Sequence, residues 1–315
     1  MRSSRDLCVA TMLCIVALHG CGGTEDDPVS AVDDSSTPSV TRSERVWVDA
    51  SRSTPRTSRF PGAMHRELRT LVWQPAIATP LPLLVLAHGY GGLPEKFDAF
   101  VRAIAAAGYV VAAPAFPLTN EHAPGGHEVG LRDAVSQPGD VSFVLTQLLD
   151  EAASLGQPLA GRIRSAEIAV LGHSLGGVTA IALTRKACCQ DARVGAAIFF
   201  AAPLFLADLF FSGPVSATGP RTMILHGTAD SNVGYATATE IFALLSPPRL
   251  LIGLNGVGHS EALESQSEPP IPARRAAQVA TIAYLNDAFR NASEQLDSAL
   301  ATLAAEGHTV QVDSE

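Results

Sequence analysis

The sequence predicts an α/β fold, in which a mostly parallel central sheet carries helices on both faces and no large lid covers it. Short, continuous apolar runs typical of buried strands alternate with segments whose apolar residues recur at helical spacing. Apolar residues make up 47% of the chain, enough for a substantial core, and charged residues only 17%. The 315 residues suit one sizeable domain or two small ones.

Predicted strands and helices follow one another along the chain. The strands are the apolar runs at residues 81–87, 109–113, 168–171, 196–202, 222–226 and 250–254. The helices are the periodic segments at residues 95–107, 141–153, 176–186, 235–245 and 273–289. Gly108 is expected to end the first helix and Asp140 to cap the second. Residues 116–138, rich in Gly, Pro and His, predict a long loop.

The first 21 residues resemble an export signal. Arg2 and Arg5 supply a positive start, and residues 7–18 are almost wholly apolar but too short to span a bilayer. The Leu-His-Gly that precedes Cys21 resembles a bacterial lipobox. That resemblance implies a lipid on Cys21 and, with Gly22 rather than Asp next, anchoring at the outer membrane. The alternative is a cleaved signal that leaves Cys21 unmodified and the protein periplasmic or extracellular.

Composition divides the remaining chain. Residues 22–45 are rich in Ser, Thr, Asp and Pro and predict a disordered tether. A globular domain is expected over residues 46–290, followed by a C-terminal helix or tail at 291–315. The net charge is −9 and no Lys/Arg block occurs, which argues against a nucleic-acid partner.

Cysteine spacing predicts no metal site, because no C-x₂-C pair is present. Cys188 and Cys189 are adjacent, and two alternatives stay open for them. They form a vicinal disulfide in an oxidising compartment, or they are two semi-buried thiols at the end of a helix.

A candidate nucleophile stands in Gly172-His173-Ser174-Leu175-Gly176-Gly177, between a predicted strand and a predicted helix. In that context a G-x-S-x-G sequence forms a sharp turn with the serine at its apex, because a Cβ at the glycine positions would clash with the strand and the helix. The sequence therefore predicts that Ser174 is a catalytic nucleophile rather than part of a structural turn.

A serine nucleophile needs a general base and a carboxylate that orients the base. In this fold class the order along the chain is Ser, then Asp or Glu, then His. Asp230 follows the strand at 222–226, and His259 follows the strand at 250–254. Both are therefore predicted at the edge of the sheet where loops converge. Asp208 is a rival acid without that context.

The tetrahedral intermediate of acyl transfer needs backbone donors for its oxyanion. One is expected to be the N–H of Leu175, and the second the N–H of Tyr90 in His88-Gly89-Tyr90-Gly91-Gly92. The alternative for that loop is a Gly-rich turn without a catalytic role. Tyr90 and His173 are the residues expected to contact the substrate.

Taken in order, the HGYGG loop, GHSLGG, LHGTAD and GVGHS resemble the α/β-hydrolase superfamily over residues 46–290. More narrowly, PLLVLAHGYGG, YVVAAPAFPLT and QPGDVSFVL resemble the branch of platelet-activating-factor acetylhydrolases, chlorophyllases, dienelactone-hydrolase-like proteins and cutinase-like polyester hydrolases. The resemblance implies carboxylester hydrolysis through an acyl-enzyme, without a cofactor, on a small-molecule ester. Ser174 departs from true dienelactone hydrolases, which place Cys there. Polyester cleavage is not expected, because neither Trp47 nor Trp73 falls near the catalytic elements.

Two other functions remain open alongside an esterase, which is expected to be a monomer. The same residues suit an acyltransferase or amidase, and a surface lipoprotein can retain the fold only for binding. About twenty residues separate Ala202 from Arg221, too few for a large lid, so small or medium acyl groups are expected. This stretch either lines an acyl pocket or forms a helix packed on the sheet.

Overall fold

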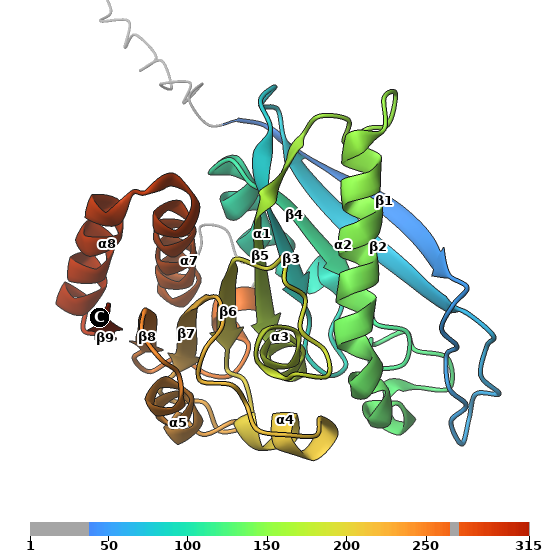
Figure 1. The fold of residues 1–315 in the computed structure, drawn as a ribbon. Helices are drawn as coiled ribbons and strands as arrows, with labels where there is room; N and C mark the ends of the chain where they lie inside the picture. Colours follow the sequence, from blue (N-terminus) through green and yellow to red (C-terminus); the bar gives the residue numbers. More distant parts are fainter. Residues whose placement is uncertain (1–37, 265–270, 315) are drawn as a thin grey trace, which may run out of the picture. The chain divides into compact units, whose positions relative to one another are not determined.

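The computed structural model describes residues 38–264 and 271–314, and the described strands form one nine-stranded sheet (Figure 1). The strand order is β1-β2-β4-β3-β5-β6-β7-β8-β9. The six strands in the middle of this order pair in parallel with one another, namely β4, β3, β5, β6, β7 and β8. The pairs at the two sides are antiparallel, namely β1 with β2, β2 with β4 and β8 with β9. The predicted α/β fold with a mostly parallel sheet is confirmed.

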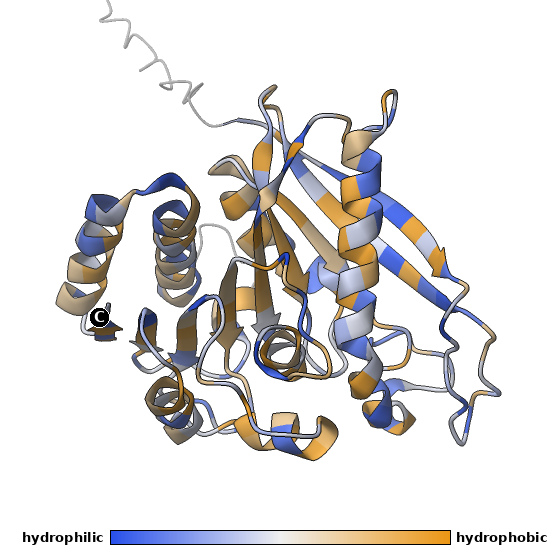
Figure 2. Ribbon diagram, viewed as in Figure 1, coloured by the Kyte–Doolittle hydropathy of each residue, from blue (hydrophilic) through white to orange (hydrophobic). Residues whose placement is uncertain are grey.

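Strand bounds differ from the sequence prediction mainly at the ends. The strands are β1 Val40–Asp49, β2 Arg66–Pro75, β3 Leu81–Ala87, β4 Val110–Pro114, β5 Ile163–His173, β6 Ala196–Phe200, β7 Arg221–Gly227, β8 Arg249–Leu254 and β9 Thr309–Asp313. Every residue of β3, β4 and β6 is buried. These strands have helices on both sides, which explains why they are apolar throughout rather than alternating (Figure 2).

Helices cover both faces of the sheet, as predicted. They are α1 Asp98–Ala106, α2 Gln137–Ala153, α3 Leu175–Arg185, α4 Leu204–Phe210, α5 Ala236–Leu244, α6 Glu261–Glu264, α7 Pro272–Arg290 and α8 Ser293–Ala305, with 3₁₀ turns at Pro94–Phe97, His127–Val129 and Leu131–Ser136. The core divides into two clusters, one with side chains of α2, α3 and α5 and the other with side chains of α1, α7 and α8. None of the described helices is long and apolar enough to cross a membrane.

The sheet extends beyond the domain predicted at residues 46–290. β1 begins at Val40, inside the predicted tether of residues 22–45, and within the predicted C-terminal helix or tail α8 is followed by β9, which continues the sheet. Both are edge strands held by backbone pairing to one neighbour, so their side chains are largely exposed and polar and give no apolar run. The predicted export signal, Cys21 and the tether up to residue 37 lie outside the described residues.

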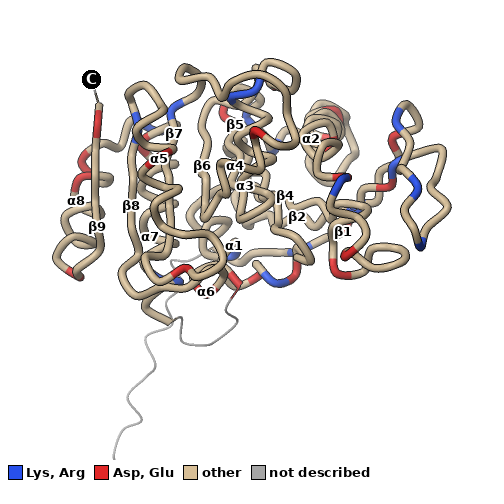
Figure 3. Tube along the Cα trace, turned by 90° about the horizontal axis from the view of Figure 1, so that it is seen from below, with Lys and Arg blue, Asp and Glu red and all other residues tan. Residues whose placement is uncertain are grey.

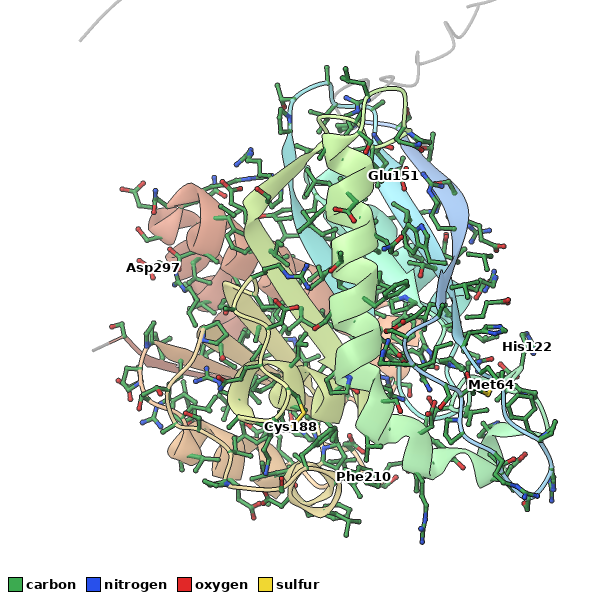
Figure 4. All side chains as sticks on the ribbon, turned by 45° about the vertical axis from the view of Figure 1, so that its right-hand side comes forward. Met64, His122, Glu151, Cys188, Phe210 and Asp297 are labelled. Carbon is green, nitrogen blue, oxygen red and sulfur yellow. A yellow bond between two sulfur atoms is a disulfide. The ribbon has the colours of Figure 1, made fainter. Side chains whose placement is uncertain are left out.

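Cys188 and Cys189 form a vicinal disulfide in the structure (Figure 4). The two cysteines follow α3 directly, where the chain turns towards β6. Of the two alternatives left open by the sequence, the disulfide is the one that the structure contains.

Asp140 lies in the first turn of α2 and does not cap the helix, which begins at Gln137. Its buried carboxylate receives two hydrogen bonds from Arg66, whose Nε and Nη2 each lie 2.6 Å from it. Asp133 accepts two more bonds from the same guanidinium, each 2.9 Å long. Arg66 on β2 therefore joins the loop before α2 to the helix itself.

In Figure 3 charged residues gather near β1, whereas β6, β7 and β8 are mostly uncharged.

Arg66→Met should lower the free energy of unfolding by about 3–5 kcal/mol, because it leaves Asp133 buried without its cation and Asp140 with Arg52 alone. Arg69→Met is the matched control on the same strand, since Arg69 is 34% exposed and its pairs with Glu44 and Glu95 lie at the surface. That change should cost less than about 1 kcal/mol. Urea denaturation of both variants measures the difference, and equal small losses would contradict the role of Arg66.

His88 joins the ends of two neighbouring strands. Its Nδ1 donates to the carbonyl of Gly89 at 2.7 Å, and its Nε2 accepts the N–H of Phe116 at 3.0 Å. The ring thereby connects the end of β3 to the end of β4. Burial lowers the pKa of His88 to about 4, because no water is available to solvate a charged ring.

This pKa predicts a loss of stability at mildly acidic pH. Between pH 6.5 and about 4 the unfolded chain binds a proton that folded His88 does not, so stability is complete above pH 6.5 and falls as the pH falls. The contribution has a slope of at most about 1.4 kcal/mol per pH unit. His88→Asn should flatten the dependence of unfolding free energy on pH in this range, whereas a change at exposed His122 should not. An unchanged slope in His88→Asn would refute this assignment.

Candidate active site

Ser174 lies at a sharp turn between β5 and α3. Its backbone has φ +54° and ψ −119°, a conformation that residues other than glycine rarely adopt. A Cβ on Gly172 would lie 2.0 Å from the carbonyl oxygen of Gly176, and a Cβ on Gly176 would lie 2.0 Å from that of Ala87. The turn therefore closes only with glycine at both positions. The N–H of Ser174 donates to Phe200 on β6 at 2.9 Å.

The structure brings Ser174, His259 and Asp230 together. His259 Nε2 is 2.9 Å from the hydroxyl oxygen of Ser174, and His259 Nδ1 is 2.7 Å from Oδ2 of Asp230. The three residues come from the ends of β5, β8 and β7, which are neighbours through β6. Parallel strands place their carboxyl ends at one edge of the sheet, so residues 29 and 85 positions apart in sequence meet there only if the strand order is correct.

Asp230 is held on both of its carboxylate oxygens. Oδ1 accepts the N–H groups of Asn232 and Val233 at 2.8 and 2.9 Å, while Oδ2 faces His259. Burial alone would raise the pKa of this carboxyl, but the bonds from Val233 and His259 bring it below the usual value. Asp230 is therefore an ionised acceptor that fixes the proton of His259 on Nδ1. His226 supports the same loop through Nε2, which donates to Val233 at 2.8 Å.

Asp208, the rival acid, is directed elsewhere. It lies on α4 and accepts a 2.7 Å bond from Lys186, which is fully buried at the end of α3. Lys186 also donates to the carbonyls of Phe211 and Gly213. The ion pair thus attaches the segment around α4 to α3 and does not orient the histidine. This use of Asp208 was not predicted.

The Gly-rich loop after β3 passes directly beside the nucleophile. A Cβ on Gly89 would lie 3.1 Å from the Cβ of Ser174. Among the described residues, the N–H groups of Tyr90 and Leu175 have no backbone hydrogen bond, whereas Gly91 and Gly92 donate to Thr119 and to Gly89. Leu175 is the first residue of α3, where helices leave their N–H groups without internal partners. In the described part of the chain, the two N–H groups that were predicted as oxyanion donors are therefore not used by other backbone groups.

A cleft of about 490 Å³ opens over Ser174. Tyr90 borders it and is 40% exposed, with its hydroxyl donating to the carbonyl of His127. One wall of the cleft is apolar and is formed by Leu131, Pro203, Phe205 and Leu206. Phe205 and Leu206 belong to α4, which also packs Ala207 into the core. Of the two alternatives for residues 203–220, the structure shows a short helix packed on the core over Leu204–Phe210, and the same helix lines the cleft.

His173 borders the cleft, but its ring is directed into the protein. The residue is 2% exposed, and Nε2 donates to the backbone carbonyl of His259 at 3.0 Å. Burial, followed by the neighbouring His259, lowers the pKa of His173 to about 3. The expected contact of this side chain with substrate is replaced by a contact with the histidine of the site.

Sequence reasoning missed Glu264, which lines the cleft from α6, because no motif marks its position.

Two comparisons with known proteins agree with this architecture. The sequence model of the Chlorophyllase family matches residues 53–202, a range that contains the Gly-rich loop and Ser174 but ends before Asp230 and His259. A ferulic acid esterase from Streptomyces cinnamoneus has a similar structure, with a TM-score of 0.63 and 20% sequence identity. That match covers 83% of this chain and 93% of the esterase.

No cluster of three or more His, Cys, Asp or Glu suited to a metal ion occurs in the described residues. With its parallel sheet, its strand–turn–helix at Ser174 and its acid and histidine on later strand ends, the chain has an α/β-hydrolase fold.

Proposed function

We propose that the protein is a serine carboxylester hydrolase that works through an acyl-enzyme on small or medium acyl esters. The observation that carries this proposal is the unbroken chain of contacts from Asp230 through His259 to Ser174, 2.7 and 2.9 Å long. The likeness to the Chlorophyllase family and to a ferulic acid esterase supports an ester as the bond that is cleaved.

The mechanism follows from the positions of the protons. Ser174 Oγ attacks the ester carbonyl while His259 Nε2 takes its proton, and Asp230 stabilises the resulting imidazolium. The N–H groups of Tyr90 and Leu175 stabilise the oxyanion. His259 then protonates the alcohol oxygen as the C–O bond breaks. Water attacks the acyl-serine with His259 as the base, and the carboxylic acid leaves as Ser174 regains its proton.

Export and a lipid on Cys21 are part of the same proposal. They are supported by the apolar segment at residues 7–18 and by the lipobox-like sequence that ends at Cys21. An enzyme attached in this way acts outside the cytoplasm. That location is compatible with the disulfide between Cys188 and Cys189.

Replacing a member of the triad should reduce the rate of ester hydrolysis far more than replacing the rival acid, Asp208. Ser174→Ala and His259→Ala should each lower kcat for p-nitrophenyl butyrate by several orders of magnitude, and Asp230→Asn by roughly 10⁴-fold. Asp208→Asn is the matched control and should lose less than about tenfold, because Asp208 binds Lys186 rather than His259. A loss of only tenfold in His259→Ala would mean that another group is the base.

The apolar wall predicts which residue governs acyl length. Phe205 is 68% exposed and lines the cleft, whereas Leu209, one turn later on α4, is 70% exposed but does not. Phe205→Ala should lower kcat/KM for p-nitrophenyl hexanoate relative to the acetate by roughly three- to tenfold, because apolar contact with the longer chain is lost. Leu209→Ala should leave this ratio unchanged. The same ratio in wild type and Phe205→Ala would exclude this wall as the acyl site.

A further inference from the structure

A second set of contacts joins the nucleophile's strand to the loop of the histidine. His173 ends β5, immediately before Ser174, and its Nε2 lies 3.0 Å from the carbonyl oxygen of His259. A carbonyl only accepts hydrogen bonds, so Nε2 carries the proton and donates. The rings of His173 and His259 also pack together, with centroids 4.9 Å apart. His259 is thus held at its backbone by the residue that precedes the nucleophile.

With its proton on Nε2, the neutral ring of His173 presents a lone pair on Nδ1. Burial lowers the pKa of this histidine to about 3, so a second proton on the ring is strongly disfavoured. Nδ1 is buried and has no hydrogen-bond partner among the described residues. A buried acceptor without a hydrogen bond costs about 1–3 kcal/mol of stability, and a donor placed beside Nδ1 would remove that cost.

The group that faces Nδ1 is the carboxyl of Glu264, whose Oε1 lies 3.5 Å away. Glu264 ends α6, the short helix that begins two residues after His259. Its side chain is 25% exposed, and burial raises the pKa of its carboxyl despite the opposing effect of Lys96. An ionised carboxylate would set an oxygen lone pair against the lone pair of Nδ1, whereas a protonated carboxyl would present a donor.

We propose that Glu264, while protonated, donates to His173 Nδ1 and completes a buried chain from Glu264 through His173 to the carbonyl of His259, which positions the general base. The proposal rests on the proposed function, since it concerns the histidine of that site. Closing the contact requires the carboxyl to approach by roughly half an ångström, from 3.5 Å to a normal hydrogen-bond length. No group is transferred, and Glu264 and His173 are positioning residues that act through His259.

The proposed hydrogen bond from Glu264 to His173 depends on pH and should weaken as the pH rises. The donor is present at low pH and is lost as the pH rises through the titration of Glu264. The charged or titratable groups around the pair are Lys96, Glu121 and His259 near Glu264, and Asp230, His88 and His259 near His173. Of these, only His259 acts on both members of the pair and lies in the catalytic chain.

The experiment compares two replacements of Glu264. Glu264→Gln keeps the shape and offers an amide N–H to Nδ1 at every pH. It should retain kcat to within about threefold and remove one ionisation from the alkaline side of the kcat profile. Glu264→Leu offers no donor, so it should lower kcat by roughly ten- to a hundredfold with KM changed by less than about threefold. Glu121→Gln is the matched control, since it removes a charge beside Lys96 without facing His173.

A readout independent of activity separates this proposal from the proposed function. In protein labelled with ¹⁵N at histidine, the Nδ1 resonance of His173 should shift with pH in the wild type and stay constant in Glu264→Gln. Equal loss of activity in the Gln and Leu variants, or unchanged profiles in both, would overturn the relay. A moving Nδ1 resonance in a protein whose Ser174→Ala variant still hydrolyses esters would support the contact and overturn the proposed function instead.

Discussion

The site depends on how closely three pieces of backbone approach one another at the turn that holds Ser174. A Cβ at Gly172 or Gly176 would lie 2.0 Å from a carbonyl oxygen, and one at Gly177 would lie 2.6 Å from the Cβ of Ala202. These contacts press α3 against the ends of β3 and β6. The close approach directs the hydroxyl of Ser174 outwards and leaves the first N–H of α3 available. A strained φ of +54° at Ser174 is sustained because the surrounding sheet is buried and rigid.

Most of the sheet and of the site could be predicted from the sequence, because both depend on patterns that are local. Strands β3, β4 and β6 are buried throughout, as are residues 168–173 of β5, 222–227 of β7 and 250–254 of β8, so these parts of the sheet appear as largely apolar runs. Asp230 and His259 follow such runs within a few residues, so their place at one edge of the sheet follows from the parallel topology. These inferences required no knowledge of contacts between distant residues.

What could not be predicted depends on partners that are distant in the sequence. β1 and β9 are strands only because β2 and β8 pair with them, and their own residues are mostly exposed. Asp140 has the residue type of a helix cap, but the buried cation of Arg66, 74 positions earlier, determines its role. Likewise His173 was expected to face the substrate, and its ring instead contacts the backbone of His259, 86 positions later.

The most direct test of the account is to find where a fluorophosphonate probe attaches to the protein. The geometry predicts one phosphonylated residue, Ser174, identified by mass spectrometry of the digested protein, with labelling abolished in Ser174→Ala and strongly slowed in His259→Ala. Undiminished labelling of Ser174→Ala, or attachment to a different serine in the wild type, would contradict the central claim that this turn presents the nucleophile.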